Sequence, residues 1–478
     1  MSLRDTVRSR FENKRVAVIG IGVSNLPLIS FLLDAGACVT ARDIKPIEQL
    51  SPQVKELCEK RGLCVICGEG YLEELDEEII FRSPGLRPDV AQIAAAQAAG
   101  ACLTSEMELF FSLTPAKIVA VTGSDGKTTT TTLTYLLVKS LLEKSGSCGK
   151  AYVGGNIGTP LLPLVYDMSE EDIAVVELSS FQLQSMKDSP SVAVITNITP
   201  NHLNWHTDMQ EYSEAKKNIY KNGGCKRLVS NLSNEITREI LESADIEGME
   251  KVGFSLTEKS CTFTDGMVYL DDGNVILREG VCETVLLDAS NIKLPGNHNI
   301  ENYMAAAGAV YGLGFDEELF VQVLRETAHT FGGVEHRLEF VRKLDGVDYY
   351  NSSIDSSPTR TAAALRSFKD KSIVICGGYD KHIPFAPLAE VLCEKAKTVV
   401  LCGATAKAIA DAIESCPDFA SSGLEYVYEP DFYLAIERAR EAASPGDRVI
   451  LSPACASFDM FKNFEERGKK FKEAVNRL

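Results

Sequence analysis

The segment VTGSDGKTTT at residues 121–130 carries the residue types of a phosphate-binding loop. Gly123 and Gly126 have no side chain to keep backbone amides away from phosphate oxygens, and a helix that begins here adds the positive end of its dipole. Lys127 can reach the β and γ phosphates of a nucleotide, and the Thr128 hydroxyl can bind Mg²⁺. The full nucleotide-loop pattern has a glycine where this chain has a valine, so the sequence predicts a shortened variant. An ordinary helix-capping glycine turn is the alternative, but a run of threonines favours helix formation poorly.

Two further residues are candidates to hold a metal ion beside this loop. Glu177 ends the apolar run IAVVEL, at a strand tip where phosphate-binding α/β folds present a metal carboxylate. His202 follows another strand end, in NITPNHLNWH, and is a candidate metal or substrate ligand. Each also has an ordinary structural interpretation, since apolar strands often end in an acid and single histidines often belong to a core. The phosphate loop upstream favours the functional interpretation.

Lys216 lies in the segment YSEAKKNIY, which has the pattern of an amphipathic helix. Helical spacing places it on one face with Tyr212, Ala215, Ile219 and Tyr220. The neighbouring Lys217 falls outside this face. Burial would lower the pKa of Lys216 and leave a free amine, which can act as a base, form a Schiff base or add CO₂. The alternative is a lysine whose ammonium group extends to the surface.

The segment GIGVSN at residues 20–25 resembles the glycine-rich turn of dinucleotide-binding folds. Asp43 follows about 20 residues later, where an acid can meet a ribose hydroxyl. A dehydrogenase is therefore a second interpretation of this part of the chain. Asn25 replaces the third glycine, however, and a separate ATP-type loop follows, so we favour an ATP-dependent protein.

Apolar runs of strand length alternate with helical patterns along the chain, which predicts an α/β fold of βα units on parallel sheets. A length of 478 residues suits about three domains. The proline-containing break SLTPAK and the glycine pair Gly332 and Gly333 mark the boundaries. We therefore expect domains at residues 1–114, 115–332 and 333–478.

Composition excludes several classes of protein. Apolar residues make up 45% of the chain and charged residues 24%, so disordered and low-complexity classes are excluded. A net charge of −18 argues against broad binding to nucleic acid or to an anionic membrane. The N-terminus has no apolar secretion segment and no stretch reaches the length of a spanning helix. The 14 cysteines are scattered singly, apart from a CxxC without a second pair, so we expect a reduced, cytoplasmic protein.

With these residues in view, the sequence is identified as a member of the Mur ligase family, over essentially the whole chain. TGSDGKTTT resembles the family's phosphate loop, GGNIGTP its substrate-domain motif, and VVELSSFQL the strand with the magnesium glutamate. YSEAKKNIY is similar to the helix whose lysine is carbamylated in the family. The stretch LSPACASFDMFKNFEERGKKF at residues 451–471 is typical of the branch that adds D-glutamate.

The resemblance implies an N-terminal Rossmann-like UDP-binding domain, a central P-loop ATPase-like domain and a C-terminal Rossmann-like domain that binds the amino acid. It implies ATP-dependent joining of D-glutamate to UDP-N-acetylmuramoyl-L-alanine through an acyl phosphate, in cytoplasmic peptidoglycan synthesis. The implied cofactors are ATP, two Mg²⁺ ions and a carbamate on Lys216. The implied partners are small molecules only, and the enzyme is expected to be a monomer.

The resemblance also assigns site residues. Catalytic roles fall on Lys127, Lys216, His202 and Glu177, and metal binding on Thr128, Glu177, His202 and Lys216. ATP binding falls on Gly123, Ser124, Asp125, Gly126, Lys127, Thr128, Thr129, Asn299, Asn302, Arg337 (next to His336) and Asp355. Binding of the UDP substrate is assigned to Ser24, Asp43, Ser83 and Asn156. Binding of D-glutamate is assigned to Lys381, Ser356, Ser457 and Phe464.

Two segments depart from the family pattern. The usual aspartate and lysine of the ribose segment are replaced by Ser352 and Ile354, so we expect Asp355 to take over the aspartate's contact. The acids that flank the family's histidine are replaced by Asn201 and Asn204, whose amide oxygens can still accept a hydrogen bond.

The sequence also allows two alternatives to a Mur ligase that adds D-glutamate. Another Mur ligase, or an amide ligase similar to folylpolyglutamate synthase, would share most motifs but not the stretch at residues 451–471. A nucleotide-binding regulator without turnover would fit the altered ribose segment.

Overall fold

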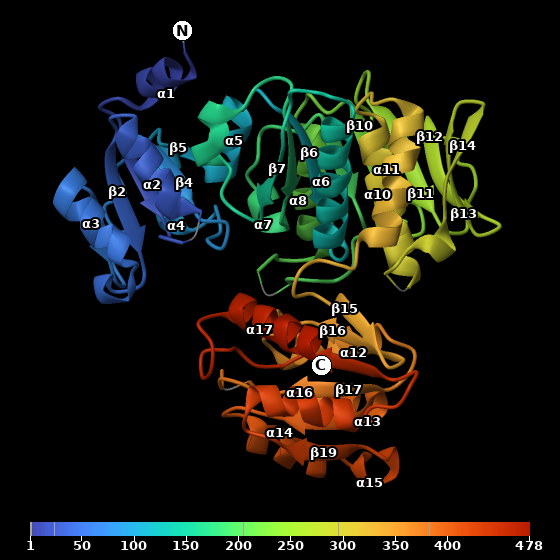
Figure 1. The fold of residues 1–478 in the computed structure, drawn as a ribbon. Helices are drawn as coiled ribbons and strands as arrows, with labels where there is room; N and C mark the ends of the chain where they lie inside the picture. Colours follow the sequence, from blue (N-terminus) through green and yellow to red (C-terminus); the bar gives the residue numbers. More distant parts are fainter. Residues whose placement is uncertain (1, 23, 204, 295, 382) are drawn as a thin grey trace. The chain divides into compact units, whose positions relative to one another are not determined.

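The computed structural model describes residues 2–22, 24–203, 205–294, 296–381 and 383–478, which form three β-sheets flanked by helices (Figure 1). The chain divides into two compact units, Met1–His329 and Thr330–Leu478. The first unit contains two of the sheets and the second unit contains the third. The predicted α/β class is confirmed, while the boundaries of the three domains stay a prediction.

The first sheet has the strand order β3-β2-β1-β4-β5, with all neighbours parallel. Its strands are β1 (Arg15–Ile19), β2 (Cys38–Asp43), β3 (Cys64–Cys67), β4 (Ile79–Arg82) and β5 (Cys102–Thr104). Its helices are α1 (Leu3–Phe11), α2 (Asn25–Asp34), α3 (Pro52–Arg61), α4 (Ala91–Ala98) and α5 (Glu106–Leu113). The order reverses between β1 and β4, and ligands of open α/β sheets bind beyond the strand ends at such a point.

The second sheet has the order β14-β13-β12-β11-β10-β9-β6-β8-β7. Its strands are β6 (Lys117–Thr122), β7 (Ala151–Gly155), β8 (Ile173–Glu177), β9 (Val192–Ile195), β10 (Arg227–Asn231), β11 (Glu250–Ser255), β12 (Gly266–Asp271), β13 (Asn274–Glu279) and β14 (Cys282–Asp288). Its helices are α6 (Lys127–Lys144), α7 (Ser180–Leu183), α8 (Met209–Lys221), α9 (Glu235–Ser243), α10 (Asn297–Tyr311) and α11 (Glu317–Thr330).

The strands β12, β13 and β14 run antiparallel, which differs from the parallel arrangement that we expected from the sequence. Only two residues connect β12 to β13, and two connect β13 to β14. Such short connections can join only antiparallel neighbours. Asp272 and Gly273 in the first connection have φ of 44° and 77°, as a tight hairpin turn requires.

The strand β14 lies at the edge of this sheet, and α11 supplies a side chain that covers part of it. The Arg325 guanidinium donates hydrogen bonds to the carbonyls of Val285 and Leu286, each at 2.8 Å. The pairing of β13 with β14 is also irregular between Val275 and Ile276. These backbone acceptors of the edge strand are therefore already bonded.

The third sheet has the order β15-β16-β20-β17-β18-β19, and only β15 runs antiparallel to its neighbour among the described strands. Its strands are β15 (Glu339–Leu344), β16 (Val347–Asn351), β17 (Ser372–Cys376), β18 (Ala396–Leu401), β19 (Glu425–Tyr428) and β20 (Arg448–Leu451). Its helices are α12 (Pro358–Arg366), α13 (Ala386–Lys395), α14 (Ala406–Glu414), α15 (Phe419–Ser422), α16 (Phe432–Glu441) and α17 (Phe464–Arg477).

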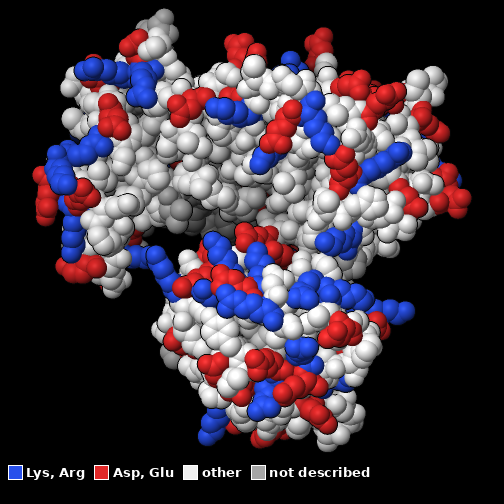
Figure 2. Space-filling view, viewed as in Figure 1, with Lys and Arg blue, Asp and Glu red and all other residues white. Residues whose placement is uncertain are grey.

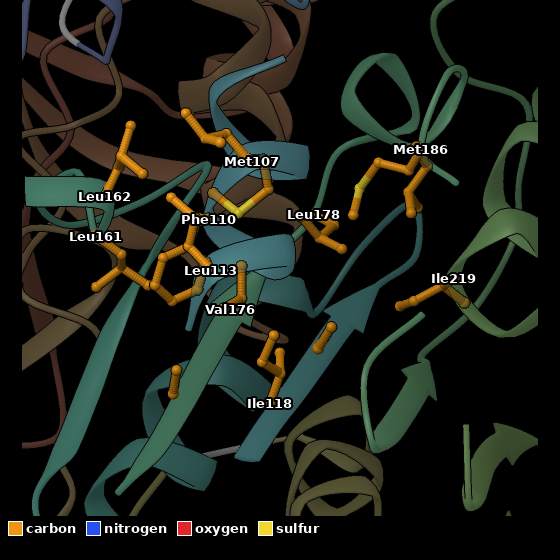
Figure 3. Close-up of a cluster of buried hydrophobic side chains, with 14 of the residues drawn as sticks. Met107, Phe110, Leu113, Ile118, Leu161, Leu162, Val176, Leu178, Met186 and Ile219 are labelled. Carbon is orange, nitrogen blue, oxygen red and sulfur yellow. The ribbon is translucent and has the colours of Figure 1, made fainter. Parts of the chain in front are cut away.

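A buried apolar cluster joins the first two sheets (Figure 3). It contains Met107, Phe110 and Leu113 of α5, which lie near Leu162 of a short 3₁₀ helix (Leu162–Asp167) and Val176 of β8. Burying each such side chain contributes about 1.5–3 kcal/mol. The cluster therefore holds α5 against the second sheet.

The surface carries charges of both signs. Basic and acidic side chains are interspersed over the visible face (Figure 2). Among the described residues, no helix is both long enough and apolar enough to cross a membrane.

Candidate active site

The predicted phosphate loop connects β6 directly to α6, as the sequence indicated. Gly123 has a φ of 149°, and a Cβ there would lie 1.9 Å from Thr196 Oγ1. At Gly126, which has a φ of 77°, a Cβ would lie 2.5 Å from the Asn302 side-chain oxygen. Both glycines are thus required for packing as well as for conformation.

Hydrogen bonds to the segment after β9 fix the loop. The backbone amides of Ser124 and Asp125 donate to the backbone and the side-chain oxygen of Asn197, each at 2.8 Å. Ser124 Oγ lies 2.9 Å from Tyr212 Oη on α8. Within the described residues, no side chain caps the first turn of α6, so its amide groups and dipole can face an anion.

The Lys127 side chain folds over this loop. Its Nζ donates to the carbonyl oxygens of Gly123 at 2.9 Å and Ser124 at 2.8 Å. Thr128 follows on the first turn of α6 and is buried, whereas Thr129 is partly exposed. The ammonium group is therefore placed at the loop where phosphate would bind.

Lys216 is buried within α8, which confirms the helical face predicted from the sequence. The buried residues of this helix are Tyr212, Ala215, Lys216, Ile219 and Tyr220. Lys216 is 1% exposed, and its Nζ donates to the Gly123 carbonyl at 2.8 Å. Burial and the nearby Lys127 ammonium lower the pKa of Lys216 well below its usual value. The neutral amine is thus favoured, and it lies beside the phosphate loop.

Glu177 ends β8 next to the loop and is also buried. One carboxylate oxygen accepts a hydrogen bond from Asn156 Nδ2 at 2.8 Å. The other oxygen has no hydrogen-bond partner among the described residues. A buried carboxylate oxygen without a partner is costly unless a cation or a ligand donor meets it. Asn156, which we predicted as a substrate ligand, contacts this carboxylate.

His202 has a left-handed backbone conformation, with a φ of 55°. Its ring packs on Phe181, with 4.8 Å between ring centroids. The residue is exposed overall, but partial desolvation of its ring and the positive charges of Lys127 and Lys216 lower its pKa, so the neutral imidazole that can bind a metal is favoured. Asn201 is exposed beside it, and Asn204 lies outside the described residues. No three His, Cys, Asp or Glu side chains form a metal-holding group in the part of the chain that the structure describes.

Asn299 and Asn302 meet the phosphate loop from α10. Asn302 accepts a hydrogen bond from Thr130 Oγ1 and donates one to Asn299 Oδ1, each at 3.2 Å. A cavity of about 130 Å³ opens beside them, which can hold only part of a nucleotide because ligand pockets usually measure about 300–1,000 Å³. The residues that line it are Asp125, Gly126, Thr196, Asn197, Asn231, Phe254, His298, Glu301 and Asn302.

Several of these lining residues were not predicted from the sequence. His298 and Glu301 belong to the segment GNHNIENY, which already carried two candidates, so proximity was a signal for them. Asn231 is the last residue of β10, and Phe254 lies in β11. Only the order of the strands in the sheet brings these two residues to the cavity.

Three of the four predicted UDP-side residues, Ser24, Asp43 and Ser83, lie where the first sheet reverses its order, whereas Asn156 follows β7 of the second sheet. Ser24 precedes α2 directly, and Ser83 follows β4 directly. A Cβ at Gly20 would lie 2.7 Å from that of Ser83, so the two turns touch. Asp43 accepts hydrogen bonds from the amides of Ile21 at 2.7 Å and Lys45 at 2.9 Å. Its carboxylate thereby also shapes the glycine turn.

In the second unit, the predicted amino-acid residues follow the ends of β16, β17 and β20, which are neighbours in the sheet. Lys381 Nζ donates to the backbone oxygen of Ser356 at 3.2 Å. Ser457 is buried in the loop after β20, and Phe464 begins α17. The structure therefore brings Lys381 and Ser356 together and holds the other two on neighbouring segments.

The predicted nucleotide residues of this unit differ in exposure. His336 is buried and lies 3.0 Å from Asn351 Nδ2, whereas Arg337 is exposed. Asp355 is 6% exposed and accepts a hydrogen bond from Ser452 Oγ at 2.8 Å. Burial raises its pKa. A ribose contact by Asp355 stays a prediction.

Fold and site together define an α/β protein of the phosphate-loop class, with a buried lysine and carboxylate beside the loop. Two family models match: the Mur ligase middle domain over residues 121–310 and the Mur ligase glutamate ligase domain over residues 336–455. The chain is 48% identical to the UDP-N-acetylmuramoylalanine–D-glutamate ligase of Ruminiclostridium cellulolyticum over 98% of this chain and 97% of that protein. It is 47% identical to the ligase of the same name from Acetivibrio thermocellus, over 98% of each chain. The chain belongs to the Mur ligase family.

Solved structures show the same fold. The UDP-N-acetylmuramate–alanine ligase of Thermotoga maritima has a TM-score of 0.53 at 18% identity, over 97% of this chain and 100% of that chain. A pseudomurein peptide ligase type C from Methanothermus fervidus has a TM-score of 0.51 at 19% identity, with the same coverage.

Proposed function

We infer that this chain is an ATP-dependent ligase that joins D-glutamate to UDP-N-acetylmuramoyl-L-alanine in peptidoglycan precursor synthesis. The observation that carries this inference is the 48% identity over 98% of the chain to a ligase of that name. The arrangement of Lys127, Glu177 and Lys216 around one phosphate loop supports it. The stretch at residues 451–471 supports D-glutamate as the amino acid.

The reaction has two chemical steps. The carboxylate of UDP-N-acetylmuramoyl-L-alanine attacks the γ-phosphorus of ATP, which forms an acyl phosphate and releases ADP. The neutral amine of D-glutamate then attacks the acyl carbon, the new amide bond forms as the nitrogen loses a proton, and phosphate leaves with the electron pair of the broken C–O bond and can take up that proton. The first step brings two anionic groups together, and in the second step negative charge remains on the leaving phosphate, so positive charge must be held at the phosphates.

The phosphate loop supplies part of that charge. Lys127 lies within the loop, and its present acceptors are the loop's own carbonyls at 2.8–2.9 Å. We propose that the γ-phosphate replaces these carbonyls as the acceptor. The amide groups at the start of α6 orient the phosphate chain.

The residues around the loop fit magnesium. The unpartnered Glu177 oxygen, the Thr128 hydroxyl and the neutral His202 ring offer donors of suitable type. Mg²⁺ uses only one or two protein carboxylates and takes its other ligands from phosphate and water. When bound, Mg²⁺ would neutralise the transferring phosphate and the substrate carboxylate.

We propose further that Lys216 carries a carbamate. Its buried, neutral amine can add CO₂ and lose a proton, which turns a group that would repel a cation into an anionic oxygen ligand. Lys127 is close enough to depress the pKa of Lys216, and the same positive charge would stabilise a carbamate.

The remaining assignments divide between the two units. Ser24, Asp43 and Ser83 would hold the UDP part of the substrate, and Asn156 would orient it beside Glu177. In the second unit, Lys381, Ser356, Ser457 and Phe464 would hold D-glutamate, and Arg337 would meet the nucleotide with Asp355 on the ribose side. We propose that the enzyme acts as a monomer in the cytoplasm, where ATP is available and its free thiols stay reduced.

Release of ADP tests this function. We expect continued turnover, with more than one ADP per enzyme, only when ATP, Mg²⁺, UDP-N-acetylmuramoyl-L-alanine and D-glutamate are all present, and one amide product per ADP. A panel of other amino acids under the same conditions distinguishes related ligases. Equal turnover with L-alanine or a diamino acid would contradict D-glutamate specificity. No turnover with any amino acid, D-glutamate included, would favour a regulator.

A further inference from the structure

The loop that follows β4 is bracketed by two arginines. Arg82 ends the strand, and Arg87 follows the residues 83–85 that begin the loop. Arg82 donates a hydrogen bond to Phe181 on α7, 99 residues away in sequence, and Arg87 donates one to Glu211 on α8, 124 residues away. The loop that carries Ser83 is therefore fastened to the part of the chain that carries the phosphate loop.

Arg82 is 1% exposed, and its guanidinium contacts both the loop after β4 and the segment around α7. One terminal nitrogen donates to the carbonyls of Ser83 at 3.3 Å and Pro84 at 3.1 Å, which shapes the loop. The other nitrogen donates to the Phe181 carbonyl at 3.1 Å and to Ser185 Oγ at 2.9 Å. Phe181 lies on α7, which begins three residues after Glu177.

Arg87 makes the second contact. Its guanidinium donates to both carboxylate oxygens of Glu211, at 2.9 and 3.2 Å, and also to the Trp205 carbonyl. The same guanidinium lies 5.0 Å from the centre of the Trp205 ring. In return, Trp205 Nε1 donates to the Gly85 carbonyl at 2.9 Å.

Glu211 links this contact to the site. It lies in the first turn of α8, the helix that carries Lys216, and it accepts the Thr207 amide at 2.6 Å. The hydrogen bond from Arg87 lowers the pKa of Glu211 to about 2, so the ion pair persists at every pH where the enzyme would work. Trp205 lies three residues after His202. Both segments at the proposed metal site thus contact the loop.

On the function proposed above, the first sheet holds the UDP substrate and the second sheet holds ATP, so the attacking carboxylate must be placed across this junction. We propose that Arg87 is a positioning residue that fixes the substrate loop at residues 83–85 against the His202 and Lys216 segments, with Arg82 as a second, buried support. A displacement of about 1 Å between reacting groups can cost about 100-fold in rate.

Asp89 provides a matched control. It also accepts hydrogen bonds from Arg87, at 2.7 and 2.8 Å, but it belongs to the first sheet's own loops and is largely exposed. Asp89→Asn therefore removes one ion pair of the same arginine without touching the junction. Arg87→Met keeps an apolar side chain against Trp205 and removes every donor.

The test compares steady-state kinetics of these variants. We expect Arg87→Met to lower kcat about 10-fold or more while the KM values for ATP and for the UDP substrate change less than about threefold. Arg87→Lys should recover part of kcat because it retains a cation facing Glu211, and Asp89→Asn should match the wild type. Trp205→Phe, which removes the bond to Gly85 and leaves a smaller aromatic ring beside Arg87, should lower kcat in the same pattern.

Hydrogen exchange gives a readout that does not need turnover. We expect Arg87→Met, but not Asp89→Asn, to increase amide exchange at residues 83–90 and 205–211. Unchanged exchange would overturn the contact itself. A normal kcat in Arg87→Met would overturn the positioning role, and a rise confined to the KM of the UDP substrate would make Arg87 a direct ligand instead. Failure of the wild type to use D-glutamate would overturn only the proposed function.

Discussion

The ammonium group of Lys127 lies on the carbonyls of its own loop, so its removal leaves the apolar core intact. We therefore expect Lys127→Ala to abolish turnover with little loss of stability, because the charge that meets the γ-phosphate is missing. ADP release and thermal unfolding measure the two effects separately. A variant with near-normal turnover would refute the assignment of the phosphate loop.

Lys216 allows a more specific test. We expect Lys216→Ala to lose nearly all activity, and acetate to restore part of it by supplying the carboxylate oxygens of the proposed carbamate. Addition of ¹³C-bicarbonate to the wild type should give a carbamate signal that the variant lacks.

Lys217 is the matched control for this prediction. It lies next in sequence but forms an ion pair with Glu214 at 2.6 Å, away from the loop. Lys217→Ala should therefore be nearly neutral. Full activity of Lys216→Ala without any added carboxylate would show that the metal site does not depend on this lysine.

At the residue scale, the sequence was sufficient where local spacing decides the outcome. The position of Lys216 inside α8 followed from helical periodicity. The contacts of Arg82 and Arg87 could not be predicted, because they depend on how segments 99 and 124 residues apart in sequence meet. The bond from Asn156 to Glu177 likewise depends on the pairing of β7 with β8.

Among the elements, α5 carries a buried acid. Glu106 is 6% exposed, and burial raises its pKa to about 7. Below about pH 4.5 it is protonated in both the folded and the unfolded state. As the pH rises toward 7, only the unfolded state ionises, so the folded state loses stability on the order of 3 kcal/mol.

Glu106→Gln removes this titration. We expect the variant to lose less of its free energy of unfolding than the wild type does between pH 4.5 and pH 7.5, measured by urea denaturation. Glu318→Gln on the exposed face of α11 serves as the control. An unchanged pH dependence in Glu106→Gln would show that other groups set it.

The order of strands and helices was more predictable than their direction. The strands at residues 15–19, 38–43 and 117–122 lie where apolar runs indicated them. The antiparallel hairpins of β12 to β14 were not predicted, although an Asp-Gly pair such as Asp272 and Gly273 is typical of a tight hairpin turn. The two-residue connections carried the information on direction, because connections this short can join only antiparallel neighbours.

For the whole molecule, the two compact units meet in sequence between His329 and Thr330. His336 and Arg337 follow the glycine pair, Gly332 and Gly333, that marks the predicted domain boundary. We predict that these residues reach the nucleotide only in a closed, ligand-bound arrangement of the two units. Solution scattering should then show a smaller radius of gyration with an ATP analogue and the UDP substrate together. An unchanged radius at saturation would count against closure.

The bonds from Arg325 to β14 bear on how copies of the chain meet at high concentration. An exposed edge strand can pair with the same edge of another molecule and start a growing sheet. Here two carbonyls of that edge are already held by a guanidinium, at 2.8 Å each. A second copy would have to displace these charge-assisted bonds before it could extend the sheet. These two bonds therefore oppose sheet extension through this part of the β14 edge.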